Sequence, residues 1–289
     1  MNVRAINSSS RALLLAKRAN QQKISRTNIS WVVPLSWEDR EIRYAFAASH
    51  GLGLEVAVFC SGIALNDERV RRERVAALKS ELAGFSRTLT YHGAFIDVVP
   101  TSSDSAIAKV SRMRICQDLE TATELGCSKV VFHTGFNPNV PGWGYMDEFV
   151  DSHIRFWPSL LEAYPDVTIC LENSYESEPD LLAGIMRGVL HERFRVCLDL
   201  AHANVYSTSS LDTWMDKLSG WIAHMHWNDN YGDSDSHLPL GAGLISWEAV
   251  WEKMKMINYA LSINLEVGTL SKVQSSLVHL ASFGVRPSE

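Results

Sequence analysis

Histidine and carboxylate side chains recur in this chain at the points where short apolar segments end. Six of them follow one another in this way: His92, His133, Glu172, Asp199, His226 and Glu266. Three more residues of the same kind lie close behind, namely His202, Asp235 and His237. Nitrogen and oxygen donors without thiolate are typical ligands of Zn²⁺, Mn²⁺, Co²⁺ or Mg²⁺. The set therefore predicts a divalent-metal site or an acid/base site.

Taken singly, several of these residues have simpler explanations. Asp199 can cap a helix that follows a strand, and Asp235 can shape a turn beside Gly232. Glu172 and Glu266 are different, because a carboxylate that ends an apolar buried strand has few structural uses. The coincidence of such residues at six successive strand ends favours a functional site.

The elements that would position these residues alternate in type along the chain. Short β-rich segments are expected at 29–33, 54–59, 88–92, 129–133, 167–172, 195–199, 222–226 and 261–266. Helices are expected at 38–49, 67–84, 104–125, 146–163, 179–190, 211–218, 247–257 and 271–282. Alternation implies a parallel sheet, and eight such units imply a single (β/α)8 TIM barrel over residues 29–289. Its C-terminal mouth would gather the strand-end residues.

Alternation within the strands supports a polar barrel interior. In the segment 167–172, Val167, Ile169 and Leu171 share one face, while Thr168, Cys170 and Glu172 share the other. The apolar face would pack against helices, which leaves the polar face directed into the lumen. Burying such groups is costly unless something pairs with them, and a metal ion is a suitable partner.

Composition limits the class of protein. The formal charge of -6 and pI near 5.9 do not favour binding to nucleic acid or to anionic lipid. The five cysteines are scattered and form no close pair, as is typical of reduced thiols in a cytoplasmic protein. No apolar run reaches the roughly 18 residues that a membrane span needs.

The first 28 residues carry six basic side chains and no acidic one. We expect a basic N-terminal extension over residues 1–28 that packs on the barrel or on a second copy of the chain. An organelle transit segment has a similar composition and stays an alternative.

Three tryptophans lie near the expected mouth of the barrel: Trp143, Trp227 and Trp247. Aromatic side chains commonly line ligand pockets, and we expect these three to line a substrate pocket. Packing in the core is the alternative explanation.

The motifs around these residues resemble those of the xylose-isomerase-like barrel superfamily, over residues 30 to 285. They are Thr-Tyr-His-Gly-Ala-Phe at His92, Val-Val-Phe-His-Thr-Gly at His133, Ile-Cys-Leu-Glu-Asn at Glu172, Val-Cys-Leu-Asp-Leu-Ala-His at Asp199 and His202, His-Met-His-Trp-Asn-Asp-Asn at His226 and Asp-Ser-His-Leu-Pro-Leu-Gly-Ala-Gly at His237. Together these motifs are specific to the superfamily, which contains sugar isomerases and epimerases and the endonuclease IV group. They are much less specific to one reaction.

Resemblance to the epimerase branch implies one divalent metal held by Glu172, Asp199, His226 and Glu266. Glu172 and Glu266 would be the acid/base pair that moves a proton through an enediolate, and His202 would contact the sugar or hydroxycarbonyl substrate. Resemblance to the endonuclease branch implies three zinc ions shared by nine residues, and all nine have counterparts: His92, His133, Glu172, Asp199, His202, His226, Asp235, His237 and Glu266.

The acidic charge, and the lack of dense Arg/Lys clusters interleaved with aromatic residues in the expected mouth loops, favour the isomerase over the nuclease. A small-molecule substrate is therefore expected and nucleic acid is disfavoured, while a homo-oligomer stays open. A barrel that binds metal or ligand without catalysis is a third possibility, which the complete set of ligands disfavours.

Overall fold

Eight parallel strands form a closed barrel in this computed structural model, which describes residues 29–287 apart from 141, 143, 255, 256 and 258. The strands are β1 (Ile29–Leu35), β2 (Gly53–Val56), β3 (Leu89–His92), β4 (Lys129–His133), β5 (Thr168–Glu172), β6 (Phe194–Asp199), β7 (Ile222–Trp227) and β8 (Leu261–Leu265). They follow chain order around the ring, and β8 pairs with β1 to close it. The predicted (β/α)8 barrel is confirmed.

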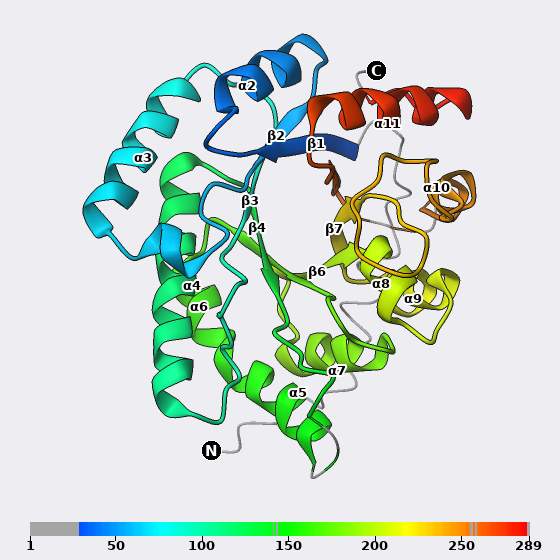
Figure 1. The fold of residues 1–289 in the computed structure, drawn as a ribbon. Helices are drawn as coiled ribbons and strands as arrows, with labels where there is room; N and C mark the ends of the chain where they lie inside the picture. The colour runs from blue at the N-terminus through cyan, green and yellow to red at the C-terminus, as the bar shows by residue number, and fades with distance from the viewer. Residues whose placement is uncertain (1–28, 141, 143, 255–256, 258, 288–289) are drawn as a thin grey trace, which may run out of the picture.

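Helices surround the ring of strands (Figure 1). They are α2 (Arg40–Ser49), η2 (Gly62–Leu65), α3 (Glu68–Glu81), α4 (Ser105–Leu125), α5 (Tyr145–Phe156), α6 (Pro158–Ala163), α7 (Asp180–Val189), α8 (Leu200–Tyr206), α9 (Leu211–Leu218), α10 (Trp247–Met254) and α11 (Leu270–Ser282). Among the described residues, no helix combines the length and the apolar character that crossing a membrane requires.

The two faces of the strands contribute to separate apolar clusters, as the alternation predicts. Ile169 and Leu171 belong to the large core between strands and helices, whereas Cys170 belongs to a small cluster inside the barrel. Full burial of an aliphatic side chain stabilises the fold by about 1.5–3 kcal/mol, so the outer layer supplies most of the hydrophobic stabilisation. The interior is consequently free to carry polar groups.

Three local features differ from the prediction. The single helix expected over 146–163 is divided into α5 and α6, because Pro158 has no N–H to continue the hydrogen-bond ladder. Strand β2 ends at Val56 rather than at residue 59, and the short helix α8 was not predicted. The basic extension over residues 1–28 and the predicted pocket residue Trp143 lie outside the described residues.

Trp157 should be one of the most important core residues for stability. Its fully buried ring packs against Phe132 and Phe194, and its Nε1 donates a hydrogen bond to His153. Trp157→Ala removes these contacts and leaves a cavity, so we expect the free energy of unfolding to fall by about 3–5 kcal/mol. Urea unfolding followed by circular dichroism measures this. A loss below about 1 kcal/mol would show that this part of the core closes around the gap.

Candidate metal centre

The C-terminal ends of β5 to β8 bring four of the predicted ligands together. Glu172 and Asp199 end β5 and β6, His226 lies near the end of β7, and Glu266 directly follows β8. Strand pairing places Asp199 opposite His226. One donor atom from each of the four residues lies within 4.8 Å of the others. This spacing fits a single divalent cation.

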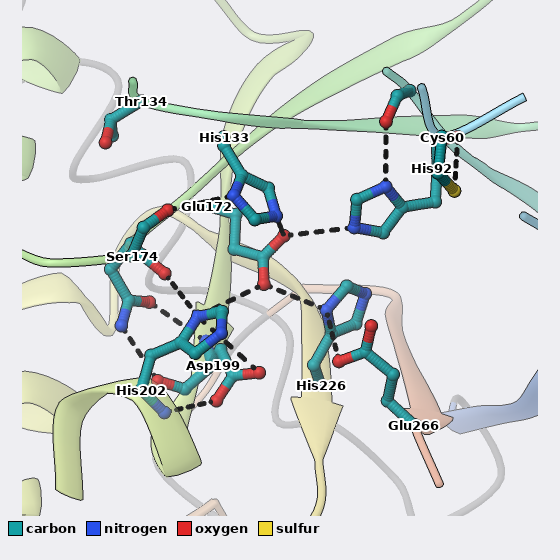
Figure 2. Close-up of polar contacts among 12 residues, drawn as sticks. Cys60, His92, His133, Thr134, Glu172, Ser174, Asp199, His202, His226 and Glu266 are labelled. Atoms are coloured by element: carbon teal, nitrogen blue, oxygen red, sulfur yellow. Dashed lines mark hydrogen bonds and ion pairs between the residues drawn. The ribbon is translucent and has the colours of Figure 1, made fainter. Parts of the chain in front are cut away.

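Glu172 stands in the middle of a wider set of imidazoles (Figure 2). Its Oε2 lies 3.5 Å from Nε2 of His92 and 3.3 Å from Nε2 of His133. Its Oε1 lies 3.0 Å from Nδ1 of His226 and 3.6 Å from Nδ1 of His202. The two carboxylate oxygens thus face different pairs of imidazoles, and a carboxylate placed in this way can bridge two cations.

A carboxylate flanked by two further imidazoles lies beside these residues. Asp235 Oδ2 is 3.4 Å from Nε2 of His202 and 3.1 Å from Nε2 of His237. His237 adopts a left-handed backbone conformation with φ of 43°, which is rare outside glycine and is held by its surroundings. Its backbone carbonyl accepts a hydrogen bond from Lys272. All nine predicted metal or substrate residues are therefore gathered at one mouth of the barrel.

Three of the histidine rings, those of His92, His202 and His237, each have a backbone acceptor for one ring nitrogen. Backbone carbonyl oxygens accept from Nδ1 of His92, His202 and His237 at 2.8–2.9 Å. Because a carbonyl oxygen only accepts, Nδ1 carries the proton in each case and Nε2 is directed at the carboxylates. This fixed orientation is the usual support for a metal-binding imidazole.

Two buried carboxylate oxygens lack hydrogen-bond donors in the described part of the chain, as the ligands of a cation would. Glu172 Oε2 and Asp235 Oδ1 are inaccessible to solvent and accept no well-formed hydrogen bond from the described residues. An unpaired carboxylate oxygen is costly in the interior, and a cation would compensate this cost. The donor set of imidazole and carboxylate suits zinc, manganese or cobalt.

Ionisation in the metal-free protein follows from the same contacts. Burial raises the pKa of Glu172, but the His226 and His133 rings outweigh it and hold the pKa well below its usual range. Burial lowers the pKa of His202, but Asp199 and Asp235 raise it well above its usual range. Protons on imidazoles thus balance the carboxylates when no metal is bound.

A model of the xylose isomerase-like TIM barrel family matches residues 34–282. The chain belongs to this family. An uncharacterized protein of Methanocaldococcus jannaschii is 29% identical over 190 residues, which are 62% of this chain. The chain spans 64% of the length of that relative.

Solved structures of similar fold come from proteins of different descriptions. A D-tagatose 3-epimerase-like protein shares 24% identity with a TM-score of 0.74, over 88% of this chain and 96% of that one. A protein from Thermus thermophilus soaked with ZnCl2 shares 23% identity with a TM-score of 0.69, over 89% and 98%. Endonuclease IV from Thermus thermophilus shares 18% identity with a TM-score of 0.60, over 88% and 97%. At these identities the likeness establishes the barrel fold alone.

In this xylose isomerase-like barrel, two of the predicted pocket residues lie in the hydrophobic core and not at the candidate site. Trp227 and Trp247 are fully buried and pack against each other with ring centroids 4.7 Å apart. Trp31 contacts the Trp227 ring from β1. The prediction that Trp227 and Trp247 line a substrate pocket is wrong, because both rings belong to the core outside the strands.

Glu55 is a site residue that the sequence prediction missed. It lies within β2, is 1% exposed, and its Oε1 is 3.0 Å from Nε2 of His226. Its Oε2 is 2.8 Å from Nε2 of His224. A carboxylate between Leu54 and Val56, in an otherwise apolar strand, is the signal that could have identified it.

Other buried carboxylates hold the loops that carry the ligands. Asp118 accepts hydrogen bonds from Tyr91 and from the backbone N–H of Ala94, on either side of His92. Asp229 accepts from the backbone of Gly241 and from Trp247, and so folds back the loop that contains Asp235 and His237. These contacts hold the candidate metal ligands in place.

Zinc binding should weaken as the pH falls. Burial lowers the pKa of His237, but its hydrogen bond to Asp235 raises that pKa to about 9, so the ring is protonated at neutral pH. A metal requires the neutral ring, so binding at neutral pH must release this proton and affinity must rise with pH. Titration calorimetry in buffers of different ionisation enthalpy measures the release. A heat of binding that is independent of the buffer would contradict this prediction.

Proposed function

We propose that the protein is a metal-dependent hydrolase of small phosphate esters that holds three divalent cations, with zinc as the preferred ion. The observation that carries the proposal is the Glu172 carboxylate, whose two oxygens face two separate ligand groups. The third group, His202, Asp235 and His237, extends the set. Ligands for several neighbouring cations are typical of enzymes that cleave phosphate esters.

Charge balance supports more than one cation. Five carboxylates lie in or against the site: Glu55, Glu172, Asp199, Asp235 and Glu266. With neutral imidazoles, one divalent cation would leave a formal charge of −3, whereas three would leave +1. With one cation, protons on three imidazoles would have to balance the remaining −3, whereas a slightly positive site with three cations needs no such protons and attracts an anionic ester.

The accessible side of the site indicates how a substrate approaches. The side chains of Glu266, Asp235 and His133 are 22%, 24% and 18% exposed, whereas Glu172 is 1% exposed. The half-exposed ring of Phe95 stacks on His133 with centroids 4.5 Å apart and offers an apolar wall for the non-phosphate part of a substrate.

Bound divalent cations would supply Lewis-acid polarisation of the phosphoryl oxygens and would lower the pKa of water. Glu172 would hold two neighbouring cations at a fixed spacing. Glu266, on the open side, would accept a proton from the attacking water at the carboxylate oxygen that does not face His226. The similar structure that was soaked with ZnCl2 supports zinc as the ion to test first.

A metal-dependent isomerase or epimerase is the second candidate function. Donor atoms of Glu172 and Glu266 lie within 4.8 Å of each other beside Asp199 and His226, as an acid/base pair around one metal would require. The D-tagatose 3-epimerase-like structure supports the same reaction class for a small sugar. The position of Glu172 argues against the isomerase. Four imidazoles surround this carboxylate and leave little access for a carbon-bound proton of a substrate.

Substrate assays separate the two candidates. Chelator-treated protein reloaded with zinc should hydrolyse p-nitrophenyl phosphate or bis-p-nitrophenyl phosphate, and chelator-treated protein without added zinc should not. A small ester should be cleaved in preference to an abasic-site DNA duplex, because the chain carries a net charge of -6. Absence of ester hydrolysis, together with deuterium uptake from D2O into a ketose, would replace the hydrolase with the isomerase.

A further inference from the structure

The barrel interior beneath the candidate metal centre is polar. Its apolar cluster is small and comprises Val131, Cys170, Cys197 and Ala223. Alongside it lie Glu55, His224 and Ser262, each no more than 1% exposed. Buried polar groups of this kind are costly unless they bond to one another, so their partners are informative.

Four contacts connect the N-terminal end of the barrel with the candidate metal centre. Lys129 Nζ donates to Ser262 Oγ at 2.8 Å, and Ser262 Oγ lies 2.6 Å from Nδ1 of His224. Nε2 of His224 lies 2.8 Å from Oε2 of Glu55. Oε1 of Glu55 lies 3.0 Å from Nε2 of His226, a charge contact without the alignment of a full hydrogen bond. We call Lys129, Ser262, His224 and Glu55 the lumen chain.

Each proton position in the lumen chain follows from its neighbour. The Lys129 ammonium group only donates, so the Ser262 oxygen accepts from it and gives its own proton to Nδ1 of His224. Nε2 of His224 must then carry the proton that it donates to Glu55. With a neutral His224 ring, this is the one assignment of protons that satisfies all three hydrogen bonds.

Glu55 is saturated as an acceptor. Besides the two histidines, it accepts from Thr90 at 2.8 Å and from Asn264 at 2.5 Å. A carboxylate in this position favours a proton on Nε2 of His226, so the proton that Nδ1 donates to Glu172 in the metal-free protein is the one that a cation would replace. That Nδ1 lies 3.0 Å from Glu172 and 3.2 Å from Glu266, where a cation would bind.

Lys129 is fixed at the far end of the lumen chain. Its Nζ also donates to the carbonyl oxygens of Ala223 and Ala260 at 2.7 and 3.0 Å. Lys129 begins β4 and His133 ends it, so they are separated by roughly 13 Å along the strand at about 3.3 Å per residue. The lumen chain therefore spans the barrel from the N-terminal ends of its strands to the candidate ligands.

We propose that the lumen chain sets the orientation and proton position of the His226 ring, so that Glu55, His224 and Ser262 are positioning residues for metal binding. This inference rests on the proposed metal centre. It predicts that a change of one hydroxyl group, remote from every proposed ligand, alters how the protein binds metal.

Ser262→Ala tests the lumen chain, because it removes the hydroxyl between Lys129 and His224 and touches no ligand. Ser111→Ala is the matched control, since Ser111 is also buried and accepts a hydrogen bond from Val99, but lies in α4. We expect Co²⁺ affinity to fall about tenfold or more in Ser262→Ala, with a changed visible spectrum of bound Co²⁺, and to be unaltered in Ser111→Ala. Chelator competition measures the affinity.

Glu55→Gln covers the case in which Ser262→Ala fails to fold. Glutamine keeps the shape, but its NH2 group cannot accept from an imidazole N–H, so a similar or larger loss of Co²⁺ affinity is expected. If either folded variant binds Co²⁺ with the affinity and visible spectrum of the wild-type protein, the positioning role of the lumen chain is wrong, while the metal centre is unaffected. Failure of the wild-type protein to bind Co²⁺ would instead overturn the metal centre.

Discussion

Glu172→Gln is expected to lose two of the three cations and nearly all activity. Oε2 of Glu172 faces His92 and His133, and Glu172 also belongs to the group with Asp199, His226 and Glu266. Glutamine has one carbonyl oxygen and cannot bridge two cations. Because loss of a supporting residue already costs 10–100-fold in metal affinity or activity, we expect loss of a bridging ligand to cost at least about 100-fold in activity.

Metal analysis and ester hydrolysis of the same preparation test this expectation. The third group, His202, Asp235 and His237, should still hold its ion in the variant, so the metal content should fall by about two per chain rather than to zero. Glu178→Gln is the control, because Glu178 is an exposed carboxylate that bonds to Thr208 and Ser209 outside the site. If Glu172→Gln binds as much metal as the wild-type protein, Glu172 does not bridge two cations.

Removal of metal is expected to lower thermal stability strongly. An ion present at 100 times its Kd stabilises the fold by about 2.7 kcal/mol, so three ions add several kcal/mol. For a chain of this size, about 2–4 °C in Tm corresponds to each kcal/mol, and we expect EDTA to lower Tm by more than about 10 °C. The cause is the group of buried carboxylates that lose their partners.

Calorimetry with EDTA, followed by addition of zinc, measures this effect. Zinc should restore the original Tm, and Glu172→Gln should respond much less to EDTA than the wild-type protein. If the Tm of the wild-type protein is the same with EDTA and with zinc, the carboxylates and imidazoles balance one another without metal.

The convergence of the candidate ligands could be predicted because barrel strands impose a simple periodicity. In β5 and β6, apolar residues alternate with Thr168, Cys170 and Glu172, or with Cys197 and Asp199, and the last polar residue of each strand necessarily lies at the mouth. Parallel strands in sequential order then bring these ends together.

The same periodicity explains the error at Trp227. His224 and His226 point into the barrel, so the next residue of β7, Trp227, must point outward and pack against Trp31 and Trp247. A residue next to a strand end in the sequence is therefore part of the pocket only if its side chain also points into the barrel.

Glu55 was missed for a different reason. It lies within a strand rather than at its end, and its partners His224 and His226 are about 170 residues away in the chain. Sequence alone gives no measure of which lumen residues meet across a closed barrel. The depth of Glu55 below the mouth became apparent only from the register of β1 and β3 against β2.

A count of bound metal in the purified protein tests the account most directly. Protein saturated with zinc, desalted and measured by elemental analysis should contain about three zinc ions per chain, one for each ligand group. One ion per chain, or none, would contradict the trinuclear site on which the proposed hydrolase depends.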